Sequence, residues 1–145
     1  MSNLGTRGKW AEKQVLEWLG PRSDNDIKFA FHRLPDARSA RGALASQPAD
    51  YYVMHNGQFT HLEVKETEHP LRLVRGKVSQ YGTLKKFWLA GGKTNLVVYR
   101  SHSDTWTFFT TEELFKANSE PPTSFVFVVG RDFPTAAATL KHLYP

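Results

Sequence analysis

Two apolar-rich runs joined by an Asn-Gly pair form the clearest pattern of hydrophobic and polar positions in the chain. Residues 50–55 read DYYVMH and residues 58–65 read QFTHLEVK, with Asn56 and Gly57 between them. Asn-Gly between apolar runs is typical of a β-hairpin with a two-residue turn, because both turn residues need a positive φ. The pattern therefore predicts two antiparallel strands in a fixed register.

This register brings three charged residues to one face of the sheet. It pairs His55 with Gln58, and it places Asp50 opposite Glu63, with Cβ atoms about 4.5–5.5 Å apart. Lys65 lies two residues after Glu63 and points to the same face. Two carboxylates this close repel unless a cation lies between them or one keeps its proton. A divalent-metal site for phosphoryl transfer explains the cluster; the alternative is a solvated ion cluster on an exposed sheet face.

Helical and alternating apolar spacing predicts the remaining elements. The expected helices span residues 8–19, 76–90, 111–117 and 134–143, and further strands are expected at 27–33, 95–100, 105–109 and 124–129. Gly-Pro at 20–21 is expected to end the first helix, and Gly-Gly at 91–92 to cap the second. The order helix, three strands, helix, strand predicts an α/β sheet with helices on both faces.

Composition narrows the class of protein. With 145 residues, 40% hydrophobic content and ten phenylalanines, we expect one folded domain. There is no apolar run of membrane-spanning length and no signal-peptide pattern, so no membrane is expected. The chain has no cysteine, which excludes disulfides and fits a reducing compartment. The net charge of +5 favours a polyanionic partner.

The motif residues resemble a known superfamily. Pro48-Ala49-Asp50 followed by Glu63-Val64-Lys65, in this order of elements, resembles the PD-(D/E)xK nucleases. The run 63–67, the Gly-Gly ending at 91–92 and the basic segment 34–41 are similar to RecU-like Holliday junction resolvases. The resemblance covers roughly residues 8 to 100. It implies a restriction-endonuclease-like core, a central mixed sheet flanked by helices (αβββαβ), in a single nuclease domain over residues 1–145.

The resemblance also implies roles for the motif residues. Asp50 and Glu63 are expected to bind Mg²⁺, with Mn²⁺ as a substitute, and the Val64 backbone carbonyl is a third expected ligand. Oxygen donors in small number suit Mg²⁺, which keeps several of its waters. Lys65 is expected near the attacking water or the charge that develops in the transition state.

Two helix residues complete the expected catalytic set. Glu12 lies at the end of a Gly8–Glu12 run that resembles the helix supplying an early glutamate in archaeal and phage-type resolvases. The alternative for Glu12 is a surface residue paired with Lys9 or Lys13. Gln80 is expected near the active-site water, or else it is an ordinary helix-surface glutamine.

Other acidic residues and one histidine near the motif are not expected to belong to the metal site. Asp36 also follows a proline, but no register brings it opposite Glu63. Glu66 is expected on the other face of the sheet, and both Glu66 and Glu68 are expected to be solvated. His61 falls on the Glu63 face, where a partly buried structural histidine is the favoured interpretation over a DNA contact.

Basic residues flank the proposed site in sequence and are expected to contact DNA phosphates, which gives sequence-independent, salt-sensitive binding. They are Arg33, Arg38, Arg41, Arg72, Arg75, Lys77 and Lys85. For each of these residues taken singly, a solvated surface charge is the favoured interpretation.

The motif therefore predicts a Mg²⁺-dependent endonuclease that hydrolyses DNA phosphodiesters, and the resemblance implies that its substrate is the Holliday junction. A junction has two symmetric strands to cut, so a homodimer is expected. We expect it to act in the cytoplasm of a bacterial or phage-infected cell. The alternatives are another nuclease on the same fold, acting on flaps or duplex DNA in repair or restriction, and a non-catalytic DNA-binding module.

Overall fold

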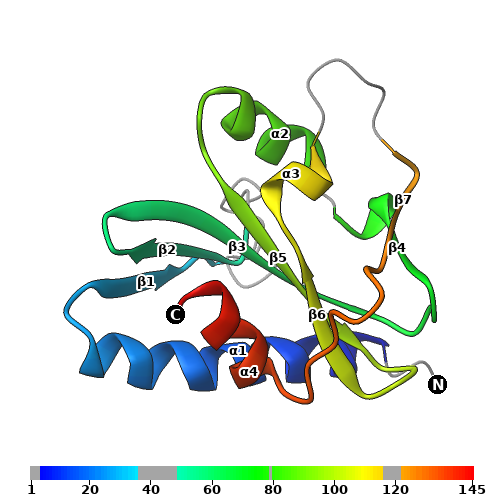
Figure 1. Ribbon diagram of the computed structural model, residues 1–145, viewed down its shortest axis with the longest axis horizontal. Coiled ribbons are helices and arrows are strands. Elements are labelled where there is room, and N and C mark those ends of the chain that lie inside the picture. Colours follow the sequence, from blue (N-terminus) through cyan, green and yellow to red (C-terminus); the bar gives the residue numbers. More distant parts are fainter. Residues whose placement is uncertain (1–3, 36–48, 79, 116–121) are drawn as a thin grey trace.

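A five-stranded mixed sheet organises the chain in the computed structural model (Figure 1). The structure describes residues 4–35, 49–78, 80–115 and 122–145. In spatial order the strands are β1 (Phe29–Arg33), β2 (Tyr51–His55), β3 (Gln58–Thr67), β5 (Thr94–Arg100) and β6 (Thr105–Phe109). β3 and β5 run parallel, whereas the other neighbours are antiparallel. The expected mixed sheet is confirmed.

The hairpin has the predicted register. His55 pairs with Gln58 and Tyr51 pairs with Leu62, so the strands are aligned as the two-residue turn requires. Asn56 and Gly57 have φ values of 50° and 80°. Positive φ at both central residues is the signature of a type I′ turn, whose twist matches that of the flanking strands.

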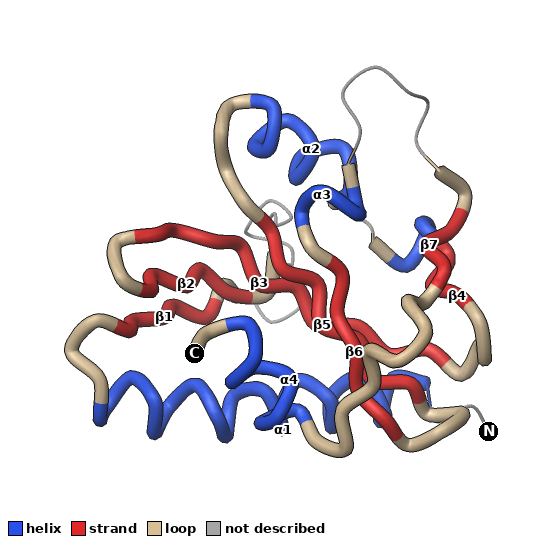
Figure 2. The backbone as a smooth tube through the Cα atoms, in the orientation of Figure 1, coloured by secondary structure: helices blue, strands red, loops and turns tan. Residues whose placement is uncertain are grey.

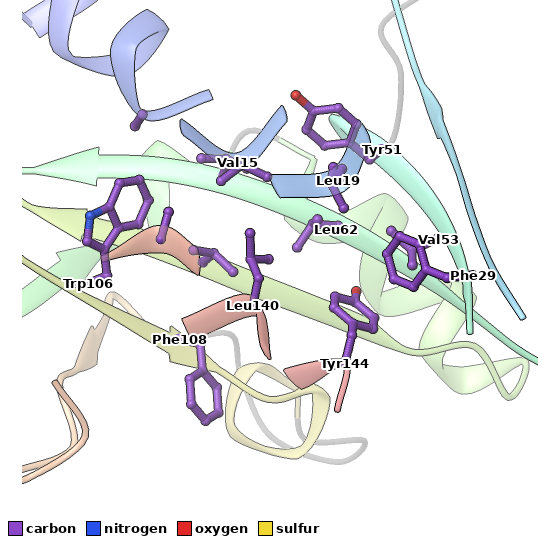
Figure 3. Packing of buried hydrophobic residues seen from close by; sticks show 14 residues of the cluster. Val15, Leu19, Phe29, Tyr51, Val53, Leu62, Trp106, Phe108, Leu140 and Tyr144 are labelled. Atoms are coloured by element: carbon purple, nitrogen blue, oxygen red, sulfur yellow. The ribbon is translucent and has the colours of Figure 1, made fainter. Parts of the chain in front are cut away.

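Helices cover both faces of this sheet, as expected. On one face α1 (Leu4–Asn25) and α4 (Ala136–Leu143) pack through Val15, Leu19 and Leu140 against Leu62 and neighbouring strand residues (Figure 3). The other face carries α2 (Tyr81–Leu89) and α3 (Thr111–Leu114). Figure 1 shows the two pairs of helices on opposite sides of the strands. Two apolar clusters, one on each face, form the core.

Helix α1 continues through the Gly-Pro pair at 20–21, where we expected it to end. Proline removes one backbone donor from a helix, but side-chain contacts hold the last turn. The Arg22 guanidinium donates to Asp26 Oδ2 at 3.0 Å and to the Tyr144 carbonyl oxygen at 2.6 Å. Arg22 and Tyr144 are far apart in sequence, so a local pattern does not show their contact, and the helix continues to Asn25.

The second predicted helix is divided. Residues 75–77 form a 3₁₀ turn, η1 (Arg75–Lys77), and α2 begins only at Tyr81 because Val78 has non-helical φ and ψ of −96° and 77°. The predicted Gly-Gly cap is confirmed: the amides at 91 and 92 donate to the carbonyl oxygens of Trp88 and Phe87 at 2.9 and 2.8 Å. This is the Schellman arrangement, with Gly91 at φ 102°.

Two further strands depart from the prediction. β4 (Arg72–Val74) was not predicted, and it pairs with β7 (Ser124–Val126), which is shorter than the expected 124–129 strand. Figure 2 shows this small sheet at the side of the molecule away from β1 and β2. Both strands have only three residues, so neither carries a strong periodic signal of its own.

Other boundaries move by a few residues. β1 begins at Phe29 and leaves Ile27 exposed, and α4 begins at Ala136 with Thr135 as its N-cap. α3 ends at Leu114, while the last predicted residues of that helix, 116–117, lie outside the described residues. None of the helices in the described ranges combines the length and apolar character that crossing a membrane requires.

Replacing Gly57 by Ala should destabilise the protein by about 1 kcal/mol, because a Cβ is unfavourable at positive φ. Gly82 is the matched control: it lies in α2, has no positive φ, and a Cβ there meets nothing within 4 Å. Gly82→Ala should stabilise by about 0.5 kcal/mol. Urea unfolding of both variants measures the two changes, and changes of the same sign would contradict the turn geometry.

Candidate active site

Asp50 is fixed in place by the backbone of the neighbouring strand. It directly precedes β2, one step beyond the Tyr51–Leu62 pair, and its Oδ2 accepts a hydrogen bond from the Val64 N–H at 2.7 Å. Its carboxyl group is also hydrogen-bonded to those of Glu63 and Glu12. Three carboxyl groups therefore meet at the start of β2, with Asp50 as the shared neighbour.

Glu63 lies at the buried end of this cluster. Its side chain contacts the Lys65 Nζ through Oε1 at 2.9 Å, and the residue is only 6% exposed. Burial, and next the charge of Asp50, raise the pKa of Glu63 to about 8, against the opposing effect of Lys65. Without a cation, Glu63 therefore holds its proton to a higher pH than an ordinary glutamate does.

Lys65 supplies the positive charge of the cluster. Burial favours the neutral amine, but the charges of Glu63, Asp50 and Glu12 outweigh this effect and raise the pKa of Lys65. The ammonium group is thus held charged beside the carboxylates. The structure brings Asp50, Glu63 and Lys65 together, and the alternative of a fully solvated ion cluster does not fit the buried Glu63 side chain and its half-buried neighbours.

Glu12 reaches the cluster from helix α1. Burial, and next the carboxylate of Asp50, raise the pKa of Glu12, while Arg33 opposes them. Lys13, one of the surface partners considered for Glu12, instead lies 3.9 Å from Glu17 on the next turn. Glu12 thus points inward, as the sequence interpretation required.

The donor set suits Mg²⁺ chemically, although the carboxyl groups are hydrogen-bonded to one another. Within the described ranges no three His, Asp or Glu side chains have the spacing that a metal ion needs. Mg²⁺ requires only one or two carboxylates, and waters and phosphate oxygens complete its shell. Asp50 and Glu63 provide that pair, and the role of the Val64 carbonyl stays a prediction.

Gln80 lies at the N-terminus of α2, on the sheet face that carries Glu63 and Lys65. The backbone carbonyl oxygen of Gln80 accepts a hydrogen bond from the Leu84 backbone amide at 2.9 Å. Among the residues that the structure describes, no hydrogen bond joins the Gln80 side chain to the carboxyl groups. Its position near an attacking water therefore stays a prediction.

Only some of the predicted DNA-binding residues lie near the carboxyl cluster. Arg33, at the end of β1, acts electrostatically on Glu12. Lys77 lies close to the strand that carries Lys65, because its Nζ donates to the Glu66 carbonyl oxygen at 3.0 Å. Arg72 is exposed on β4.

The other basic residues have different surroundings. The Arg75 guanidinium lies 5.9 Å from the centre of the Tyr81 ring, and Lys85 is half-buried on α2 and interacts there with other groups. Arg38 and Arg41 lie outside the described residues.

Of the two residues near the motif for which we made structural predictions, Glu66 differs from its prediction and His61 agrees with it. Glu66 is buried, contrary to the expectation that it is solvated: it lies 3.2 Å from Arg7 Nε and accepts a hydrogen bond from Ser101 Oγ at 2.8 Å. Both faces of β3 are covered, so the face opposite Glu63 is not solvent. His61 is buried among the rings of Tyr52 and Phe87, which confirms the structural interpretation.

Sequence reasoning missed Tyr51. Its hydroxyl is buried beside the cluster, and burial together with the charge of Glu12 raises the pKa of Tyr51 to about 12. The available signal was its position: it follows Asp50 and points to the opposite face, toward the helix that carries Glu12.

Glu63→Gln should raise the stability of the metal-free protein increasingly as pH rises. The unfolded carboxyl group has a pKa of 4.5 and the folded one about 8. The folded state therefore holds the proton more tightly, and its contribution to stability is lost as pH rises from about 5 through 8. Glutamine does not titrate, so only the wild type loses this contribution. The Tm of Glu63→Gln relative to that of the wild type should therefore rise by on the order of 5 °C over this pH range.

Thermal unfolding of both proteins in EDTA between pH 5 and 9 measures this difference. Glu17→Gln, at an exposed position of α1, is the control and should change little with pH. A Glu63→Gln difference that stays constant across this range would disprove the raised pKa of Glu63.

Comparisons with known proteins give similarity to solved structures. No protein-family model matches the chain, and no curated protein matches it. Among solved structures it is similar to Hjc of Archaeoglobus fulgidus, described as a Holliday junction resolvase from an archaeal hyperthermophile. The TM-score is 0.47 with 17% identity, over 88% of this chain and 97% of that chain. At this level the similarity does not assign an activity.

Proposed function

We propose that the protein is a metal-dependent endonuclease that hydrolyses phosphodiesters of DNA. One observation carries the proposal: Glu12, Asp50, Glu63 and Lys65 converge from α1, the start of β2, and β3 on one partly buried cluster. Concentrating like charges inside a protein costs stability, so such a cluster is a mark of function more than of folding.

The residues divide the chemistry among them. Asp50 and Glu63 would hold Mg²⁺, or Mn²⁺ in its place; the bound cation would supply charge that polarises the scissile phosphate. Asp50 is oriented for this by the Val64 N–H. Lys65 places an ammonium group where the phosphoryl transition state gains negative charge. Gln80 would orient the attacking water from the N-terminus of α2.

The substrate we propose is branched DNA, a Holliday junction in the first place, cut by a homodimer. This part rests on the resemblance of the motif and its flanking segments to RecU-like resolvases. Two-fold symmetry of the enzyme would match the two equivalent strands of a junction. Arg33 and Lys77, which lie at or beside the elements of the site, and the exposed Arg72 on β4 would contact the backbone phosphates.

Asp50→Asn should reduce Mg²⁺-dependent cleavage at least about 10²–10³-fold and leave DNA binding intact, because it removes a cation ligand without removing any basic group. Asp24→Asn, at an exposed position near the end of α1, is the matched control and should cut normally. The measurement is cleavage of labelled four-way junctions, flaps, duplexes and single strands with Mg²⁺ and with EDTA.

The substrates separate the alternatives. Selective cutting of the junction supports a resolvase, and equal cutting of linear duplex rejects that specificity while keeping the nuclease. Binding of DNA without cleavage of any substrate would leave a DNA-binding module. Normal cutting by Asp50→Asn would mean that the site lies elsewhere.

Arg72→Gln should weaken binding of the junction and make it less sensitive to salt. Losing the contact between one basic side chain and a phosphate makes the negative slope of log K against log salt concentration shallower by about 0.9. Lys141→Gln on α4, across the sheet from α2, should leave this slope unchanged. Fluorescence anisotropy in EDTA, at several salt concentrations, measures binding without cleavage. An unchanged slope for Arg72→Gln removes this residue from the DNA-binding surface.

A further inference from the structure

We propose that Tyr51 is a positioning residue of the candidate active site, and that its hydroxyl donates a hydrogen bond to the Glu12 carboxylate when a divalent cation occupies the cluster. The inference rests on the proposed function, since it assumes that Asp50 and Glu63 bind the cation. It adds a residue that neither the motif nor its spacing indicates.

The ring of Tyr51 belongs to the core beneath the site. Tyr51 follows Asp50 in the chain and, by the alternation of a strand, points to the opposite face, where α1 lies. It is 0% exposed and packs in the cluster that contains Val15 and Leu19 of α1. Figure 3 shows its hydroxyl oxygen at the edge of this cluster, directed away from Leu62 and Val53.

The hydroxyl has no hydrogen-bond partner among the described residues. Buried hydroxyl groups nearly always have one, because leaving a polar group both desolvated and unpaired is costly. Phenylalanine would fill the same apolar space without this cost. Packing therefore explains the ring of Tyr51 but does not explain its hydroxyl.

The charged neighbours of the hydroxyl identify the acceptor. Glu12, Arg33 and Asp50 are the charges that act on it. A guanidinium group only donates hydrogen bonds, so Arg33 cannot accept one. Asp50 already accepts from the Val64 amide and is hydrogen-bonded to two carboxyl groups. Glu12 is the acceptor that remains.

Cation binding would free Glu12 for this role. In the structure Glu12 is hydrogen-bonded to Asp50. With Asp50 and Glu63 engaged as cation ligands, Glu12 would need another donor inside the protein. The Tyr51 hydroxyl is buried, has no hydrogen-bond partner among the described residues and feels the charge of Glu12, so it would be the donor that holds the Glu12 carboxylate in place.

Tyr51→Phe separates this role from packing, because it removes one hydroxyl and keeps the ring. The metal-free variant should be more stable than the wild type, with a Tm about 3 °C higher, since an unpaired buried group is removed. Its affinity for Mn²⁺ alone, measured by titration calorimetry on the full chain, should be about tenfold weaker. A merely structural tyrosine would not give these opposite changes.

Tyr99→Phe is the matched control. The Tyr99 hydroxyl donates to Asp104 Oδ1 at 2.7 Å on the far edge of the sheet. Its loss should lower the Tm slightly and leave Mn²⁺ affinity unchanged. In a Glu12→Ala background, Tyr51→Phe should no longer weaken Mn²⁺ binding, because the group through which it acts is absent.

The outcomes distinguish this inference from the proposed function. If the wild type does not bind Mn²⁺, both are overturned. If the wild type and Tyr51→Phe bind Mn²⁺ equally well, the proposed function stands and the role of Tyr51 is rejected. A fall in the Tm of metal-free Tyr51→Phe also rejects it, because the hydroxyl then has a partner before any cation binds.

Discussion

The hydrogen bond from the Val64 N–H to Asp50 Oδ2 is the contact on which the site depends. It ties the residue before β2 to the middle of β3, and so it carries the hairpin register one step beyond the last paired residues. Glu63 and Lys65 flank Val64 on the same strand, on the face opposite its side chain. A single backbone contact thus sets the distance between the carboxyl groups of Asp50 and Glu63, and with it the electrostatics of the whole cluster.

Those electrostatics work against folding stability. Burial and mutual repulsion disfavour ionised Glu12 and Glu63, and Lys65 offsets only part of this effect. An apolar cluster of the same volume would be more stable. The fold tolerates the site because two apolar clusters, one on each face of the sheet, surround it. Stability that these clusters provide offsets the cost of holding these charges together.

The parts of this arrangement that depend on local pattern could be predicted from the sequence. Asn56-Gly57 fixes a turn, and the period of two along a strand then places Glu63 and Lys65 without further information. The extension of α1 past Pro21 could not be predicted, because it depends on contacts between Arg22 and Tyr144, which are far apart in sequence. The burial of Glu66 and the hydroxyl of Tyr51 were missed for a related reason: both depend on α1 covering the sheet, which strand periodicity does not reveal.

Helix α1 explains why Glu12 can take part although it lies in another layer of the fold. Near its beginning, Arg7 contacts the buried carboxylate of Glu66 on β3 at 3.2 Å, and near its end Arg22 contacts the Tyr144 carbonyl oxygen. Glu12 lies between these two attachments, so neither sliding nor rotation of the helix can easily move it. A side chain on a helix held at both ends is positioned more strictly than one on a loop. The extension of α1 past Pro21, which local signals did not predict, provides the second of the two attachments between which Glu12 is held.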